Sequence, residues 1–138
     1  MRTVGFFREL GPEPVEVYAD SIRAHLAPEP LPDTDRVTRY LHDGHGLIDV
    51  MGAEPDVLGS GQRLVGGASI MTDGEWIWRD DLRFYVATYH VRLPDDFLAS
   101  IRAKGYQVPD LRVDDLRVAG KEAMRILGYH RPSAPSRP

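Results

Sequence analysis

The sequence predicts a small α+β domain, in which a short antiparallel sheet of about three strands packs with four to five helices. Strand-like segments gather in the middle of the 138-residue chain, at 47–51 and 64–78, and helical apolar spacing lies on both sides of them. Asp73-Gly74 is a strong hairpin signal, because both residue types tolerate the positive φ of a type I′ turn. Aspartates and glycines also flank the later helical segments, as helix start and stop signals do.

The central hairpin, residues 64–78, holds both tryptophans and is apolar on both faces. A two-residue loop predicts four cross-strand pairs, which are Thr72–Glu75, Met71–Trp76, Ile70–Ile77 and Ser69–Trp78. Because side chains alternate along a strand, the two isoleucines share one face and the two tryptophans share the other. We therefore expect helices on one face of the hairpin and a further layer or a partner on the other.

Five further elements are expected before the hairpin. They are a strand or anchoring arm over 1–10, a helix over 14–27, a helix from Asp33 to about 44, a buried strand over 47–51 and a loop over 52–63. The helices rest on apolar residues at helical spacing, namely Val15, Tyr18, Ile22 and Leu26 in the first and Val37, Tyr40 and Leu41 in the second. The N-terminal strand would add a fourth strand to the sheet.

Three helices are expected after the hairpin. The first follows Asp80-Asp81 as N-cap candidates, the second opens at Pro94 and stops at Gly105, and the third runs from an Asp114 cap to Gly128. Their apolar faces contain Leu82, Tyr85, Val86 and Tyr89, then Phe97, Leu98 and Ile101, then Leu116, Ala119, Ala123 and Leu127. Val113 and Val118 fit a hydrophobic staple at the last helix. We predict one domain over 1–130 and a disordered, Pro-rich tail over 131–138.

Composition narrows the classes of function. The chain is 42% hydrophobic and 28% charged, with a net charge of −4 and no basic block, so we expect no nucleic-acid partner. It has no cysteine, which excludes disulfides and Cys-ligated zinc. No apolar run approaches the roughly 18 residues of a membrane span, and no signal peptide is recognised, so we expect a cytoplasmic location and no membrane association.

Motifs that would indicate catalysis are weak throughout. His42 and His45, with Asp49 beyond them, form the most metal-like cluster, but a two-His site needs a third ligand in reach, and we predict no metal. No serine stands in a Gly-x-Ser-x-Gly turn, and the glycine-rich stretches match neither a P-loop nor a dinucleotide fingerprint. The aspartate pairs each open a predicted helix and are read as caps. We therefore predict no cofactor and no catalytic residue.

A recurring pattern begins at Gly66-Gly67 and continues through a Thr-Asp-Gly-x-Trp-x-Trp hairpin, an aromatic helix and a Leu-Pro-x-x-Phe helix. The residues that carry it are Gly66, Gly67, Ser69, Thr72, Asp73, Gly74, Trp76, Trp78, Leu82, Tyr85, Tyr89, Leu93, Pro94 and Phe97. In this pattern the middle half of the chain resembles a family of small, uncharacterised actinobacterial proteins. The resemblance implies no activity. In style, the chain is also similar to small acidic bacterial α+β proteins that act as toxin-immunity or other binding proteins.

Two functions are compatible with these features. The first is a non-catalytic protein of immunity or regulatory type that binds a protein partner or forms a homodimer, because Trp and Tyr are common interface anchors. The second is a small-ligand protein or enzyme with a pocket between the Trp hairpin and the helix that follows it. The protein-binding function would use the outward side of the hairpin and the start of that helix. The candidate binding residues are Trp76, Trp78, Arg79, Asp80, Tyr85 and Tyr89.

Overall fold

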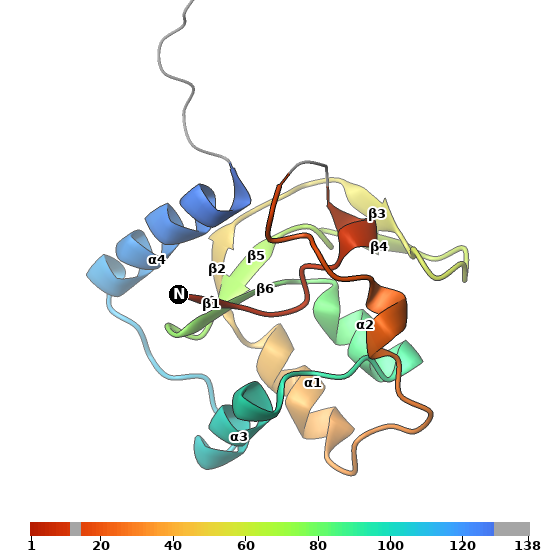
Figure 1. The fold of residues 1–138 in the computed structure, drawn as a ribbon. Helices are drawn as coiled ribbons and strands as arrows, with labels where there is room; N and C mark the ends of the chain where they lie inside the picture. Colours follow the sequence, from red (N-terminus) through yellow and green to blue (C-terminus); the bar gives the residue numbers. More distant parts are fainter. Residues whose placement is uncertain (12–14, 129–138) are drawn as a thin grey trace, which may run out of the picture.

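The computed structural model describes residues 1–11 and 15–128. The strands are β1 (Arg2–Thr3), β2 (His45–Ile48), β3 (Ala53–Pro55), β4 (Arg63–Val65), β5 (Ile70–Thr72) and β6 (Trp76–Arg79). The helices are α1 (Thr34–His42), α2 (Leu82–Tyr89), α3 (Asp95–Ala103) and α4 (Val113–Leu127), with 3₁₀ turns at Arg8–Leu10 and Ile22–His25. The α+β class is therefore confirmed, and so are the four helices expected after residue 33 (Figure 1).

The main sheet has four strands in the order β1-β6-β5-β2, and β3 and β4 form a separate two-stranded sheet. β2 and β6 are both antiparallel to β5, whereas β1 runs parallel to β6. The expected N-terminal strand thus forms, but it covers two residues only. β2 begins at His45, two residues before the expected strand, and its register shifts between Gly46 and Ile48.

The hairpin between β5 and β6 has a longer loop than the predicted two residues. Thr72 pairs with Ile77 and Met71 with Trp78, so the predicted register is wrong by two residues. The Asp73 carboxylate explains the longer loop, because it accepts hydrogen bonds from the backbone N–H groups of Glu75 and Trp76 at 2.9 and 2.8 Å. Since side chains alternate with period two, this shift leaves every side chain on its predicted face.

Both faces of the main sheet are covered by the chain itself. The tryptophan face packs against Tyr40 of α1, Leu82 of α2 and Phe97 of α3. The isoleucine face, with Ile70 and Ile77, packs against Ala123 and Leu127 of α4 and against Phe6. The further layer that the hairpin required is therefore α4, which Figure 1 shows on the side of the sheet opposite α1 and α3.

The helix expected over 14–27 does not form in the part of it that the structure describes, residues 15–27. The segment holds turns and the 3₁₀ turn at Ile22–His25, and the Ile22 N–H donates to the Glu9 carboxylate at 2.8 Å. Leu26 then forms a β-bridge with Val91. Long-range pairing thus takes backbone groups that a helix would have used, and it overrides the apolar spacing.

Two smaller expectations are also wrong. Residues 52–63, expected as a loop, contain β3 and the first residue of β4, and the other two residues of β4, 64–65, come from the predicted hairpin. The hydrophobic staple does not form, because α4 begins at Val113 itself, and Val113 and Val118 are 71% and 68% exposed. Gly128 ends α4 at a φ of 77°, as predicted. The predicted tail over 131–138 lies outside the described residues.

Candidate functional site

The two tryptophans of the predicted binding site lie inside the core. Trp78 is fully buried, and its indole N–H donates to the Leu41 carbonyl at 3.1 Å. Trp76 is 2% exposed and lies between the Arg2 guanidinium, 4.1 Å from the ring centroid, and the Phe97 ring at 4.7 Å. Neither ring presents an outward face, because residues of α1, α2 and α3 cover the tryptophan side of the hairpin.

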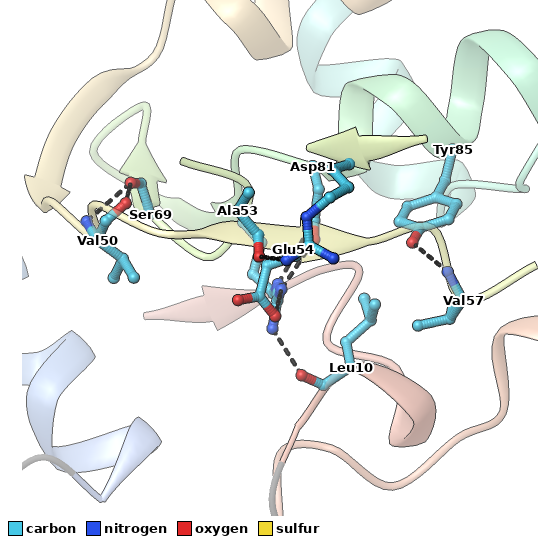
Figure 2. Close-up of polar contacts among 10 residues, drawn as sticks. Leu10, Val50, Ala53, Glu54, Val57, Ser69, Asp81 and Tyr85 are labelled. Carbon is cyan, nitrogen blue, oxygen red and sulfur yellow. Dashed lines mark hydrogen bonds and ion pairs between the residues drawn. The ribbon is translucent and has the colours of Figure 1, made fainter. Parts of the chain in front are cut away.

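Arg79 forms the main charged centre of the interior. Its guanidinium donates to both carboxylate oxygens of Asp81, at 3.1 and 2.8 Å, and to the Leu10 carbonyl at 2.8 Å. Glu54 of β3 adds a carboxylate 3.8 Å away. Figure 2 shows Leu10, Glu54 and Asp81 converging on one point from three segments that are distant in the sequence.

Burial and ion pairing act on this centre in opposite directions. Burial raises the pKa of Asp81 to about 6, although the Arg79 guanidinium acts to lower it. Burial by itself lowers the pKa of Arg79, but the Asp81 carboxylate more than offsets this and the pKa of Arg79 is raised. Both groups are therefore ionised at neutral pH. A buried, bidentate ion pair contributes little net stability, because the cost of removing both charges from water offsets their attraction. It still fixes the local geometry, because separating the two groups would leave an unpaired charge in the interior.

Tyr85 and Tyr89 of α2 bind the segment that follows β3. The Tyr85 hydroxyl accepts a hydrogen bond from the Val57 N–H at 3.0 Å, and the Tyr89 hydroxyl donates to Asp56 at 2.5 Å. Burial raises the pKa of Tyr85 to about 12, and the hydrogen bond to the Asp56 carboxylate raises that of Tyr89. Burial alone would raise the pKa of Asp56, but hydrogen bonds from Ser60, Tyr89 and Leu58 together lower it. Asp56 is therefore held as a carboxylate that organises the loop.

These contacts define the ribbon, by which we mean residues 51–65 with β3 and β4. It is attached to the body at three points, through Glu54 to Arg79, through Val57 to Tyr85 and through Asp56 to Tyr89. Beside it, the Ser69 hydroxyl contacts the N–H and the carbonyl of Val50 at 2.9 and 3.3 Å (Figure 2). Its outer surface carries two large apolar side chains, Met51 and Val65, which are 88% and 83% exposed.

The structure thus separates the six predicted residues into three groups. Trp76 and Trp78 belong to the core. Arg79, Tyr85 and Tyr89 lie beneath the ribbon and hold it. Asp80 forms a part-buried i,i+3 ion pair with Arg83 at 3.3 Å at the start of α2. The sequence analysis missed Glu54 and Asp56, because nothing local in the loop 52–63 signals which residue meets a distant segment. It also missed Met51 and Val65, which it placed in a buried strand and in the hairpin but which are exposed.

The metal-like cluster of the sequence does not come together. His45 lies 2.8 Å from the Pro109 carbonyl oxygen through its Nε2. Within residues 1–11 and 15–128 no group of three or more His, Cys, Asp or Glu side chains is arranged to hold a metal ion. In the same part of the chain, no helix combines the length and apolar character needed to cross a membrane.

Three hollows of comparable size mark the surface that the structure describes. One of about 390 Å³ lies beside β1, one of about 440 Å³ lies between α1 and α2, and one of about 460 Å³ lies beside His45 and Tyr106. None of these three is lined by Trp76, Trp78 or Tyr85. None of these three hollows therefore lies between the Trp hairpin and α2, where Trp78, Leu82 and Tyr85 are buried members of one apolar cluster.

Comparison with known proteins adds no relative. No protein-family model, no curated protein and no solved structure matches this chain. The resemblance to small actinobacterial proteins therefore stays a prediction.

Proposed function

We propose that this chain is a non-catalytic protein-binding protein, of immunity or regulatory type, and that the ribbon is its binding face. The observation that carries the proposal is the exposure of Met51 and Val65, at 88% and 83%, on a segment that is firmly attached to the body. Large apolar side chains on a surface favour a partner when they stand close together rather than singly.

Strand pairing places these two side chains near each other. Val65 is opposite Ala53, and the Gly66 N–H donates to the Gly52 carbonyl at 2.8 Å, so the antiparallel pairing continues towards Met51. Because directly opposed residues of an antiparallel pair share a face, Ala53 and Val65 lie on one face of the ribbon, and Met51 lies two residues before Ala53. Together they form an apolar surface, and Arg63, two residues before Val65 on β4, is its charged neighbour on the same face.

The attachment of the ribbon to the body lowers the conformational entropy that is lost on binding. Arg79, Tyr85 and Tyr89 hold its inner side, so the outer face needs little ordering when a partner arrives. A surface that is already ordered retains more of its contact energy as affinity. Tyr85 and Tyr89, which the sequence predicted as binding residues, thus support the proposed binding face from its inner side and are not part of it.

The charge of the chain favours a different protein over a second copy. Two copies with a net charge of −4 each repel one another, whereas a basic partner is attracted and its association accelerated. We therefore propose a partner with a basic surface around an apolar pocket.

The purified product of the neighbouring gene is the first partner to test, by calorimetric titration against the wild type and two variants. We expect Val65→Ser to weaken binding about tenfold or more, as for loss of an interface anchor. Val118→Ser is the matched control, because Val118 is 68% exposed on α4, away from the ribbon, and should bind as the wild type does.

Two outcomes would contradict the proposal. Equal losses in Val65→Ser and Val118→Ser, or none in either, would show that the ribbon is not the binding face. If the wild type forms a dimer in sedimentation velocity and Val65→Ser is monomeric, the partner of the ribbon is a second copy of the chain and not a different protein. Circular dichroism of each variant separates loss of binding from loss of fold, and both valines are exposed enough for the fold to survive.

A further inference from the structure

The hollow beside β1 has the size and lining of a small-molecule site. It measures about 390 Å³ and lies between the N-terminal segment and the link from α2 to α3. Sites for small ligands commonly measure about 300–1,000 Å³ and combine apolar walls with a few polar groups. Here the apolar walls include Phe7, Val17 and Leu93, and the polar groups are Thr3, Asp20, His25 and Arg92.

The backbone of Thr3 offers unused hydrogen-bonding groups to this hollow. The N–H groups of Arg2 and Val4 donate to Glu75 and Ile77 of the neighbouring segment at 3.0 and 3.1 Å. Backbone groups of successive residues in a strand point in opposite directions, so the N–H and carbonyl of Thr3 point away from β6. β1 ends the sheet, and no described strand pairs with its outer edge.

Arg92 supplies a cation at the same place. It lies in the extended link before α3, where its backbone N–H donates to the His25 carbonyl at 2.6 Å. Its guanidinium forms no ion pair with any residue that the structure describes. The one acidic group of the lining, Asp20, has a side chain that is 79% exposed and lies 3.8 Å from His25. Solvent screens that carboxylate, so Arg92 keeps its capacity to bind an anion.

We propose that this hollow binds a small organic carboxylate with an apolar body. The carboxylate accepts hydrogen bonds from the Arg92 guanidinium and the Thr3 N–H, because a guanidinium matches a carboxylate in geometry and charge. The apolar body lies against Phe7 and Val17. This site is separate from the ribbon and its function does not depend on the proposed partner.

Benzoate is a suitable probe, with benzamide as its neutral counterpart of the same shape. The experiment follows backbone amide resonances of the ¹⁵N-labelled full chain during titration. We expect saturable shifts centred on residues 3–7 and 92–94 with benzoate, and binding about tenfold weaker or more with benzamide or with Arg92→Gln. Arg23→Gln removes an exposed charge near His25 that does not line the hollow, and it should bind as the wild type does.

A second variant tests the hollow itself. Ala19→Leu adds bulk to the lining and should abolish the benzoate shifts while leaving the rest of the spectrum in place. Equal affinity for benzoate and benzamide would overturn the proposal, and so would equal losses in Arg92→Gln and Arg23→Gln. Shifts that rise linearly without saturation, or that survive in Ala19→Leu, would also overturn it.

Discussion

The single residues that decide this structure are polar side chains in the interior. Asp73 accepts two backbone N–H groups and the Tyr40 hydroxyl, and it thereby fixes the loop of the hairpin. Asp81 pairs with Arg79, and Asp56 binds Tyr89. The local sequence at Asp73 and Asp56 indicates only a turn and a loop, because their partners Tyr40 and Tyr89 lie on distant helices. Asp81 lies two residues from Arg79, but the sequence does not show that this pair is buried.

Asp81 should titrate well above an ordinary aspartate. Its pKa in the folded chain is about 6, above 3.8 in the unfolded chain, so the folded state binds the proton more tightly. The protonated Asp81 carboxyl therefore contributes on the order of 3 kcal/mol to the free energy of unfolding. This contribution is fully present below pH 3.8 and is lost as the pH rises through 6. The ¹³C shift of the Asp81 carboxyl, followed from pH 3 to 8, measures it directly.

Asp33 is the internal control for that titration. The Arg102 guanidinium and the Tyr106 hydroxyl lower the pKa of Asp33, so its carboxyl should titrate below the ordinary range in the same spectra. A midpoint for Asp81 at or below that of an ordinary aspartate would mean that ion pairing outweighs burial.

At the scale of elements, the local signals that agree with one another predicted the structure correctly. α1, α2, α3 and α4 each have an apolar stripe together with a start or stop residue, and all four form. The segment over 14–27 also has a stripe, with a proline at each end, yet its described part, residues 15–27, forms turns instead. An apolar stripe by itself thus shows that residues are buried and leaves their backbone conformation open.

The hairpin turn gives a prediction for one glycine. Gly74 has a φ of 100°, and a Cβ there would lie 2.9 Å from the Leu111 Cδ2 atom. Gly74→Ala should therefore lower the free energy of unfolding by about 1 kcal/mol or more, through backbone strain and the close contact. Urea denaturation of the two proteins measures the difference.

Gly46→Ala is the matched control for that measurement. Gly46 has no positive φ, and a Cβ there would meet no atom within 4 Å. We expect a much smaller effect than at Gly74. Equal midpoints for Gly74→Ala and the wild type would show that the loop relaxes without cost.

At the scale of the whole molecule, one sheet joins two apolar clusters. Trp78 belongs to the cluster with α1, α2 and α3, and Leu127 belongs to the cluster with α4. Their common element is the β5–β6 hairpin, whose side chains alternate between the clusters. The predicted single domain over 1–130 therefore implies that neither cluster persists without the other.

Leu127→Ala tests this coupling. Leu127 is 3% exposed, and removing it should cost about 2–5 kcal/mol. If the domain unfolds as one unit, the tryptophan fluorescence transition in urea should move to a lower midpoint, although Leu127 lies in the other cluster. The far-UV circular dichroism transition should coincide with it. A fluorescence midpoint that stays in place would mean that the two clusters unfold independently.

What the sequence by itself determined is the type of most elements and the need for two layers. Apolar stripes and the alternation of the hairpin are local, so they predicted α1 to α4 and the division of Ile77 and Trp78 between opposite faces, and the Asp-Gly pair predicted the positive φ of Gly74. The predicted cap at Asp114 is wrong, because α4 begins at Val113 with Arg112 as its N-cap. These properties depend on neighbours within a few residues, and the sequence displays such neighbours directly.

Tertiary structure alone decided which layer covers each face and which residues remain outside. It buried both tryptophans, placed Arg79 against Asp81 and Leu10, and left Met51 and Val65 exposed on the ribbon. These outcomes depend on segments that lie far apart in the chain, such as Leu10 and Arg79, or Val57 and Tyr85. Their packing depends on the free energy of the whole fold, because a polar side chain can be buried only where a distant segment completes its hydrogen bonds.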